Sequence, residues 1–329
     1  MITYRATLDV PAHTLAQVSR WLAAHRKHHG LRPWQRAATP YVQAVMVLRW
    51  FKEDTDLRIL ARDAGISVAT GYRYLHEAID VIADHAPDLA ETLTAGHAQG
   101  WAYVCLDGTL IASTRSSAPS QAGHDIWYSG KHRRHGGNIQ VLTDPTGYPI
   151  WTSEVEPGST HDITAARAHA LGALYPAAAA GLPTLTDKGC TGAGIGIQVP
   201  LKGHHLAPDN QARNLLISSL RAPAERANAL LKRTWRALER VTLCPWRIGA
   251  ITAAALVLLH LQKPPGEKTS SHRDSELKVP RKNAGFLNWL SVKTLREDVL
   301  TNSRGPRSPV RFPPTRVLPR EPPDGGPDS

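Results

Sequence analysis

Three acidic residues that lie far apart in the sequence have the surroundings expected of a metal-binding site. Asp107 lies in the middle of the apolar, β-prone run 101–113, where an ionised carboxylate is costly unless it is paired or binds a metal. Asp187 ends a second, shorter run, and Glu225 follows Pro223 in a helical stretch. Carboxylates supply the oxygen ligands that Mg²⁺ prefers. Because two such ions activate the attacking oxygen and stabilise the leaving oxygen of a phosphodiester, the three acids predict metal-dependent phosphodiester chemistry.

Each assignment has an alternative. An aspartate followed by glycine, as in Asp107-Gly108, is also typical of the turn after a strand. Asp162 is the rival of Asp187 for the second acid, and its other interpretation is a helix cap or a residue that supports the site from behind. Asp144 belongs to the pattern Asp-Pro-Thr-Gly, which predicts a turn between two strands.

The elements that would position these acids predict a mixed α/β domain. Three strands, the last two in a hairpin, are followed by a helix, two further strands and two helical stretches. This is the order of a ribonuclease-H-like fold, in which the first and fourth strands are neighbours, so Asp107 and Asp187 are expected to meet. The predicted strands are 101–113, 138–143, 148–155, 182–187 and 194–201, and the predicted helices are 163–174, 210–240 with an interruption at Pro223, and 248–261.

The third acid is expected from a later helix that crosses the same edge of the sheet. At 3.6 residues per turn, Asn228 and Lys232 share the helix face of Glu225. Arg221 joins that face only if Pro223 merely kinks a continuous helix. The face would then combine a carboxylate with cations, as a site for metal ions and a phosphate backbone requires.

The N-terminal region predicts an all-helical domain with a helix-turn-helix. Helices are expected over 13–30 and from residue 40 onward. A short helix over 57–64, a turn at Gly65 and a second helix capped by Ser67 form the helix-turn-helix pattern. Tyr72 and Arg73 in the second helix are the predicted DNA contacts, and an ordinary helical hairpin is the alternative.

Composition favours a nucleic-acid partner. The formal net charge of +11 points to a polyanion, either DNA or, less well, an anionic membrane. No apolar run approaches the roughly 18 residues that span a bilayer, and the N-terminus lacks the apolar core of a signal peptide. The three cysteines, Cys105, Cys190 and Cys244, are far apart, which fits a reducing cytoplasm. The predicted domains are 1–97 (helical, DNA-binding), 98–262 (nuclease) and 263–329 (a basic, Pro-rich tail without periodicity).

Five ordered motifs resemble those of DDE-superfamily insertion-sequence transposases, most of all the branch related to eukaryotic Harbinger elements. The resemblance covers residues 40–262, and the family joins an N-terminal helix-turn-helix to a ribonuclease-H-like nuclease domain. The motifs are Leu106-Asp107-Gly108-Thr109, Tyr128-Ser129-Gly130-Lys131-His132, Pro157-Gly158-Ser159-Thr160-His161-Asp162, Thr186-Asp187-Lys188-Gly189, and Arg221 with Glu225-Arg226, followed by Lys232.

The resemblance implies that Asp107, Asp187 and Glu225 bind Mg²⁺, with Mn²⁺ as a substitute. It implies cutting of element ends and their transfer into double-stranded target DNA by a homodimer or higher assembly, in a cytoplasmic, nucleoid-associated protein. Two alternatives stay open: a DNA-binding regulator that has lost catalysis, and a nuclease without strand transfer. The predicted DNA-backbone contacts of the nuclease domain are Lys131, Arg134, Arg221 and Lys232.

Overall fold

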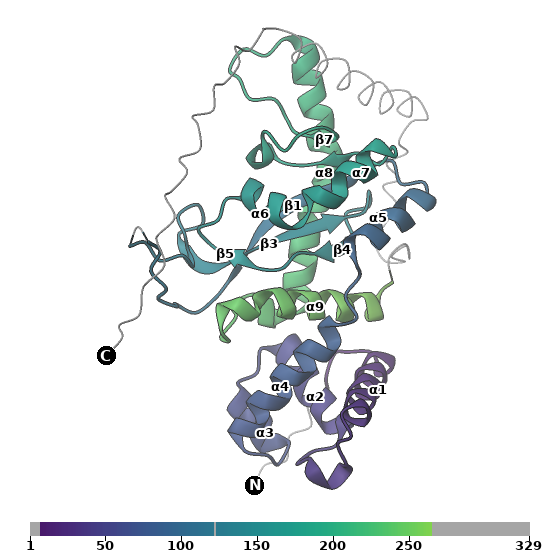
Figure 1. Ribbon diagram of the computed structural model, residues 1–329, viewed down its shortest axis with the longest axis vertical. Coiled ribbons are helices and arrows are strands. Elements are labelled where there is room, and N and C mark those ends of the chain that lie inside the picture. The colour runs from purple at the N-terminus through teal and green to yellow at the C-terminus, as the bar shows by residue number, and fades with distance from the viewer. Residues whose placement is uncertain (1–6, 122, 265–329) are drawn as a thin grey trace, which may run out of the picture.

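The computed structural model describes residues 7–121 and 123–264. Its N-terminal part consists of helices, and the part that follows combines helices with one mixed sheet (Figure 1). The predicted tail lies outside the described residues from position 265 onward. The observed architecture is therefore mixed α/β, in agreement with the predicted fold class at that level.

Side-chain caps explain where most of the N-terminal helices begin. Thr39, Asp56, Ser67 and Asp88 each accept a hydrogen bond from a backbone N–H in the first turn that follows, which satisfies a donor that the helix itself leaves free. The cap predicted at Ser67 is confirmed. The helices are α1 (Ala12–His28), α2 (Pro40–Glu53), α3 (Leu57–Asp63), α4 (Val68–Ala83) and α5 (Leu89–Ala98), with the short 3₁₀ helix η1 (Pro33–Gln35) between α1 and α2.

A tight turn joins α3 to α4, as the sequence predicts. Gly65 has a positive φ of 67°, a conformation that costs glycine little. Ala61 and Leu75 are fully buried behind this turn, and Ile66 packs against the same core. The amphipathic character of α4 leaves Tyr72 and Arg73 exposed on its outer face.

The sheet runs in the order β2-β3-β1-β6-β7, with β4 and β5 also paired to β3. β1 pairs with β3 antiparallel over eight residue pairs and with β6 parallel, so the predicted adjacency of the first and fourth strands is confirmed. The strands are β1 (Val104–Ala112), β2 (Tyr128–Ser129), β3 (Arg134–Thr143), β4 (Pro149–Thr152), β5 (Glu156–Pro157), β6 (Thr184–Leu185) and β7 (Ile197–Gln198).

Several strands are shorter than the sequence predicts. The predicted strand over 182–187 is reduced to β6, and the one over 194–201 is reduced to β7. Glycines 192, 194 and 196 all have positive φ, which bends the chain out of a ladder before β7. As a result, the edge of β1 beyond the two residue pairs with β6 is free for side chains from other elements.

The later helices differ from the prediction at two points. The predicted helix over 163–174 is two helices that meet at Ala170. The interruption predicted at Pro223 is wrong: α8 continues through it, because proline removes one hydrogen bond and bends a long helix without ending it. The helices are α6 (Asp162–His169), α7 (Leu171–Ala179), α8 (Pro208–Thr234) and α9 (Ile248–Gln262), with 3₁₀ helices η2 (Lys188–Cys190), η3 (Arg236–Leu238) and η4 (Pro245–Arg247).

Helix α9 joins the helical part to the sheet. It packs against α4 and α1 on one side and against β4 on the other (Figure 1), and its residues are buried almost throughout. Helix α5 packs against α7 and β4, and the boundary expected after residue 97 stays a prediction. Within residues 7–121 and 123–264, no helix has both the length and the apolar character needed to cross a membrane.

Candidate active site

Asp107 lies on β1 and faces α8. Asn228 Nδ2 donates a hydrogen bond of 2.9 Å to Asp107 Oδ2, and Arg221 NH2 lies 3.6 Å from Asp107 Oδ1. Both residues reach the same carboxylate because α8 continues through Pro223 and keeps them on one face. Because the helix is continuous at Pro223, Arg221 shares a helix face with Asn228, as the sequence analysis required.

Burial raises the pKa of the Asp107 carboxyl to about 6, because the surrounding protein disfavours its charged form. The Arg221 guanidinium lowers this pKa, and the charges of Asp187 and Asp162 raise it further. Three acidic side chains therefore act on one another at this edge of the sheet. A half-buried carboxylate with two acidic neighbours is typical of a site that binds a cation or transfers a proton.

Asp187 reaches this site from the neighbouring parallel strand. It follows β6 and caps η2, where its Oδ1 accepts a hydrogen bond of 2.9 Å from Gly189 N. Because β6 pairs with β1 only over Val104 and Cys105, the chain after β6 lies beside the middle of β1, where Asp107 is. Asp187 therefore lies near enough to Asp107 for its charge to raise the pKa of Asp107.

Asp162 comes to the same edge from the opposite face of the sheet. Successive side chains of a strand point to opposite faces, so Asp107 faces α8 while Gly108 faces α6. A Cβ built on Gly108 would lie only 2.6 Å from Asp162 Oδ1. One built on Gly189 would lie 3.5 Å from Asp162 Oδ2 and 2.9 Å from Asp187 Oδ1. Glycine at these positions therefore lets Asp162 approach the other two acids.

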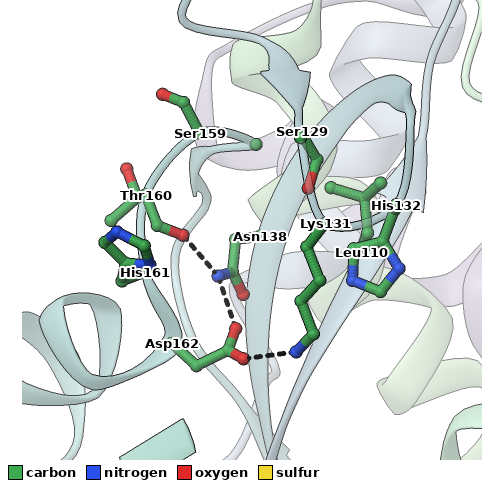
Figure 2. Close-up of a pocket in the computed structure, with 11 residues that line it drawn as sticks. Leu110, Ser129, Lys131, His132, Asn138, Ser159, Thr160, His161 and Asp162 are labelled. Carbon is green, nitrogen blue, oxygen red and sulfur yellow. Dashed lines mark hydrogen bonds and ion pairs between the residues drawn. The ribbon is translucent and has the colours of Figure 1, made fainter.

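The structure gives Asp162 partners that a helix cap would not have. The cap of α6 is His161, without a side-chain hydrogen bond, and Asp162 is the first helical residue. Asn138 Nδ2 donates to Asp162 Oδ1 at 2.8 Å, and Lys131 Nζ donates to Asp162 Oδ2 at 2.9 Å (Figure 2). Its carboxylate is therefore turned toward the sheet edge, and the capping interpretation is wrong.

Glu225 is not gathered with these aspartates. It is exposed on α8 and lines a groove together with Thr146, Tyr148 and Arg226. Within the described residues, no group of three His, Cys, Asp or Glu side chains could hold a metal ion. The assignment of Glu225 as the third acid therefore stays a prediction.

The predicted cations lie on both sides of the acids. Lys232 Nζ donates to Thr109 Oγ1 at 2.9 Å and to Leu110 O at 3.0 Å. Burial lowers the pKa of Lys232, and the nearby Arg134 lowers it further. On the other face, Lys131 forms an ion pair with Asp162, so cations lie beside the acids on both faces of the sheet.

The two residues predicted to contact DNA in the helical part are available to a ligand. Tyr72 is 44% exposed, and Arg73 is exposed with a hydrogen bond of 3.0 Å to Thr70 Oγ1. Both lie far from the aspartates, on the outer face of α4.

Two residues of β3 that support the site were not predicted. Asn138 and Gln140 are buried, and Gln140 Nε2 donates to Asn138 Oδ1 at 3.2 Å. The signal was present in the sequence: in the run 138–141 the polar residues alternate with Ile139 and Val141, so they share one face of a buried strand. Buried polar side chains on one face require partners there.

The donors present fit a divalent cation. Asp107 and Asp187 are carboxylates, and Asn228, whose Nδ2 donates to Asp107, has a buried Oδ1 without a hydrogen-bond partner among the described residues. Hard cations such as Mg²⁺ prefer oxygen ligands of this kind. The arrangement therefore offers oxygen donors of the kind that a divalent cation prefers, next to lysine and arginine side chains that suit an anionic phosphodiester.

Comparison with known proteins agrees with this chemistry. The chain has no match among curated proteins or among solved structures. Residues 106–260, from the residue before Asp107 to the end region of α9, match the family model described as DDE superfamily endonuclease. This match supports a DDE-superfamily transposase-like nuclease, with DNA as the substrate that the family implies.

Proposed function

We propose that the chain is the DNA transposase of an insertion sequence, related to the Harbinger branch. It cuts the ends of its element and joins them to target DNA. The observation that carries this proposal is the position of Asp107 on β1 and of Asp187 just after the neighbouring parallel strand β6, within the matched residues, with Arg221 of α8 beside Asp107. A ribonuclease-H-like arrangement of the sheet, and a place at the nucleoid, belong to the same proposal.

The metal of this enzyme is Mg²⁺, with Mn²⁺ as a substitute. DDE-type endonucleases typically use divalent metal ions. Asp107 and Asp187 would hold the metal, and Asn228, which contacts Asp107, has a buried oxygen that could join them. When bound, the ions supply Lewis-acid stabilisation of the attacking and leaving oxygens. The chain's own Arg221 keeps Asp107 ionised, since it lowers the pKa that burial raises.

Glu225 is the proposed third acid, and Asp162 is the rival of Asp187 for the second acid. Glu225 lies one helical turn after Arg221 on α8, and the match with the endonuclease family includes it. Asp162 and Asp187 both lie near this edge of the sheet: a Cβ built on Gly189 would lie 2.9 Å from Asp187 Oδ1 and 3.5 Å from Asp162 Oδ2. Only a comparison of the Asp187 and Asp162 variants decides between these two residues.

DNA is bound first by α3 and α4 acting as a helix-turn-helix, in which Tyr72 and Arg73 read the element ends. The nuclease part then contacts the backbone through Lys131, Arg134, Arg221 and Lys232. Transfer of two ends requires a homodimer or a higher assembly. A regulator without catalysis is less favoured, because binding alone gives no reason to bury Asp107 at a cost in stability.

The test is cleavage of a plasmid that carries the gene with its flanking DNA, in Mg²⁺ and in Mn²⁺. Variants Asp107→Ala, Asp187→Ala and Glu225→Ala are each expected to lose cleavage by a factor of about 10³ or more, because each removes a metal ligand or its charge. Their affinity for DNA should not fall, since the helix-turn-helix binds independently and less negative charge faces the phosphates.

The matched control is Glu239→Ala, an acid of the same matched region that follows η3. It should cut like the parent chain. Circular dichroism checks that every variant is folded. If Asp107→Ala and Asp187→Ala cut normally, the chain is not a nuclease of this kind. If Asp187→Ala cuts normally while folded Asp162→Ala is inactive, Asp162 replaces Asp187 as the second acid.

A further inference from the structure

A small polar cavity opens beside Asp162 on the α6 face of the sheet. Its volume is about 290 Å³, and hydroxyl and imidazole groups line it together with an ion pair (Figure 2). Lys131 and Asp162 form that pair at one end of the cavity. Ser129, Ser159 and Thr160 contribute hydroxyl groups to the rest of the wall. A polar cavity next to the acids suits part of a DNA strand.

Asp162 is fixed from behind by a chain of buried amides. Gln140 Nε2 donates to Asn138 Oδ1 at 3.2 Å, and Asn138 Nδ2 donates to Asp162 Oδ1 at 2.8 Å. Asn138 Nδ2 also donates to Thr160 O at 3.0 Å, which ties the chain to the segment before α6. Because Asn138 and Gln140 are buried on a central strand, the orientation of the Asp162 carboxylate is set by the sheet itself.

The other carboxylate oxygen of Asp162 holds Lys131. The side chain of Lys131 is 63% exposed, whereas that of Asp162 is 15% exposed. An ammonium group has three N–H donors, and within the described residues the hydrogen bond of Lys131 Nζ goes to Asp162 Oδ2. Two donors are therefore left for a ligand. The charges of Asp187 and Asp107 also act on Lys131, so its ammonium group lies near the acidic centre.

We propose that Asp162 is a positioning residue, which holds the ammonium group of Lys131 where it binds the DNA phosphate adjoining the one that is cut. This inference rests on the proposed function. A free lysine has many rotamers, and holding its ammonium group beforehand reduces the entropy lost when the phosphate binds. The pair contributes little to folding, because Lys131 is exposed and such ion pairs are worth at most about 1 kcal/mol.

The first experiment measures Lys131 directly in the full-length chain without metal. The rate of acetylation of each lysine is followed by mass spectrometry, with and without a short DNA duplex that carries the sequence flanking the gene. In the parent chain, the duplex should slow acetylation of Lys131 about fivefold, as one charged hydrogen bond of about 1 kcal/mol predicts. In Asp162→Asn, which keeps the acceptor for Asn138, protection of Lys131 should fall below about twofold.

The matched control is Asp209→Asn, another acid in the first turn of a helix, here α8. It should leave protection of Lys131 unchanged. If bound duplex leaves Lys131 unprotected in the parent chain, or protects it equally in Asp162→Asn, the inference is wrong. These results are separate from a failure of cleavage by the parent chain, which would overturn the proposed function instead.

A second experiment distinguishes a positioning residue from a metal ligand. Cleavage rates are compared for Lys131→Gln, Asp162→Asn and the double variant, and Mn²⁺ affinity is measured by electron paramagnetic resonance. If Asp162 acts through Lys131, the double variant should cut within about twofold of Lys131→Gln, because the two residues act as one unit. Mn²⁺ affinity should change less than about twofold. Multiplied rate losses, or a tenfold loss of Mn²⁺ affinity, would overturn the positioning role.

Discussion

At the scale of single residues, burial of the Asp107 carboxylate lowers the stability of the folded protein. Asp107 is half-buried between β1 and α8, and its pKa is raised to about 6 by that burial. The guanidinium of Arg221 at 3.6 Å and the charge of Lys131 only partly offset the loss of water around the Asp107 carboxylate. A carboxylate in this position is useful when a cation binds to it, which is the arrangement that the proposed enzyme needs.

The pH dependence of stability in metal-free protein follows from this raised pKa. A folded-state pKa above the unfolded value of 3.8 means that the folded protein binds the proton more tightly. The free energy of unfolding should therefore fall as the pH rises from about 4 to about 6, by up to about 2–3 kcal/mol from this group. Asp107→Asn should abolish that fall and melt a few degrees higher at pH 8, as measured by calorimetry in a chelating buffer.

The same variant tests metal binding at Asp107. Added Mn²⁺ should raise the melting temperature of the parent chain, because a ligand that binds only the folded state stabilises it. Asp107→Asn should show little or no increase, whereas the control Asp209→Asn should respond like the parent. A parent chain that is as stable at pH 7 as at pH 4.5, or an equal Mn²⁺ effect in Asp107→Asn, would contradict this account of Asp107.

At the scale of elements, the site depends on how α8 lies across β1. Ala224, Ala227 and Leu231 are buried beneath the helix, and this packing fixes which side chains face Asp107. The turn between β3 and β4 supports the same place: Gly147 has a φ of 83°, and a Cβ there would lie 2.2 Å from Pro223 O. The proline is therefore a point of close packing between the helix and the turn.

Gly147→Ala should destabilise the protein by about 2–4 kcal/mol, because it adds a strained positive φ to a clash with backbone atoms. It should also slow cleavage, since α8 carries Arg221 and Asn228 to Asp107. The matched control is Gly172→Ala in α7, where a Cβ meets nothing within 4 Å and alanine favours the helix. Thermal unfolding of both variants checks this, and equal stability of the two would contradict the packing at Pro223.

Helix α4 carries a separate prediction about DNA. Arg73→Ala should weaken binding to the element ends by about 1–3 kcal/mol if the guanidinium contacts a base edge, without a change in melting temperature because Arg73 is exposed. Fluorescence anisotropy at several salt concentrations measures the affinity. Arg20→Ala on α1 is the control, and an equal effect of both variants would count against α4 as the recognition helix.

At the scale of the whole molecule, α9 makes the helical part and the sheet depend on each other. It is buried between α4 and β4, and Arg247 before it forms an ion pair of 2.6 Å with Asp80 of α4. The helical part that is proposed to bind DNA and the sheet therefore both pack against the same buried helix, α9.

This shared helix predicts that both parts unfold together. Leu258→Ala removes a fully buried side chain of α9 and should cost about 2–5 kcal/mol. Calorimetry should show one transition in the parent chain and one at lower temperature in the variant. Exposed Leu215 of α8 provides the control, since Leu215→Ala should change the melting temperature little. Two separate transitions in the parent chain would contradict the coupling through α9.

Local sequence patterns were enough to predict several helix starts, turns and strands of this protein. The cap at Ser67, the turn at Gly65 and the apolar run around Asp107 predict elements that the structure confirms, because caps, turns and burial periodicity act over a few residues. The order of strands and helices matches that of a ribonuclease-H-like fold, in which the first and fourth strands are neighbours, and this comparison was enough to predict that Asp107 and Asp187 lie close together.

Only the tertiary structure decided which side chains meet at the acids. The spacing of α8 put Glu225, Asn228 and Lys232 on one face, but it does not give the rotation of the helix about its axis, which depends on how its buried residues pack. In the structure Asn228 contacts Asp107 and Glu225 is exposed. Likewise, Asp162 at the start of α6 accepts hydrogen bonds from Lys131, which lies between β2 and β3, and from Asn138 on β3. Such contacts join residues that are distant in sequence, and only the packing of the whole domain brings them together.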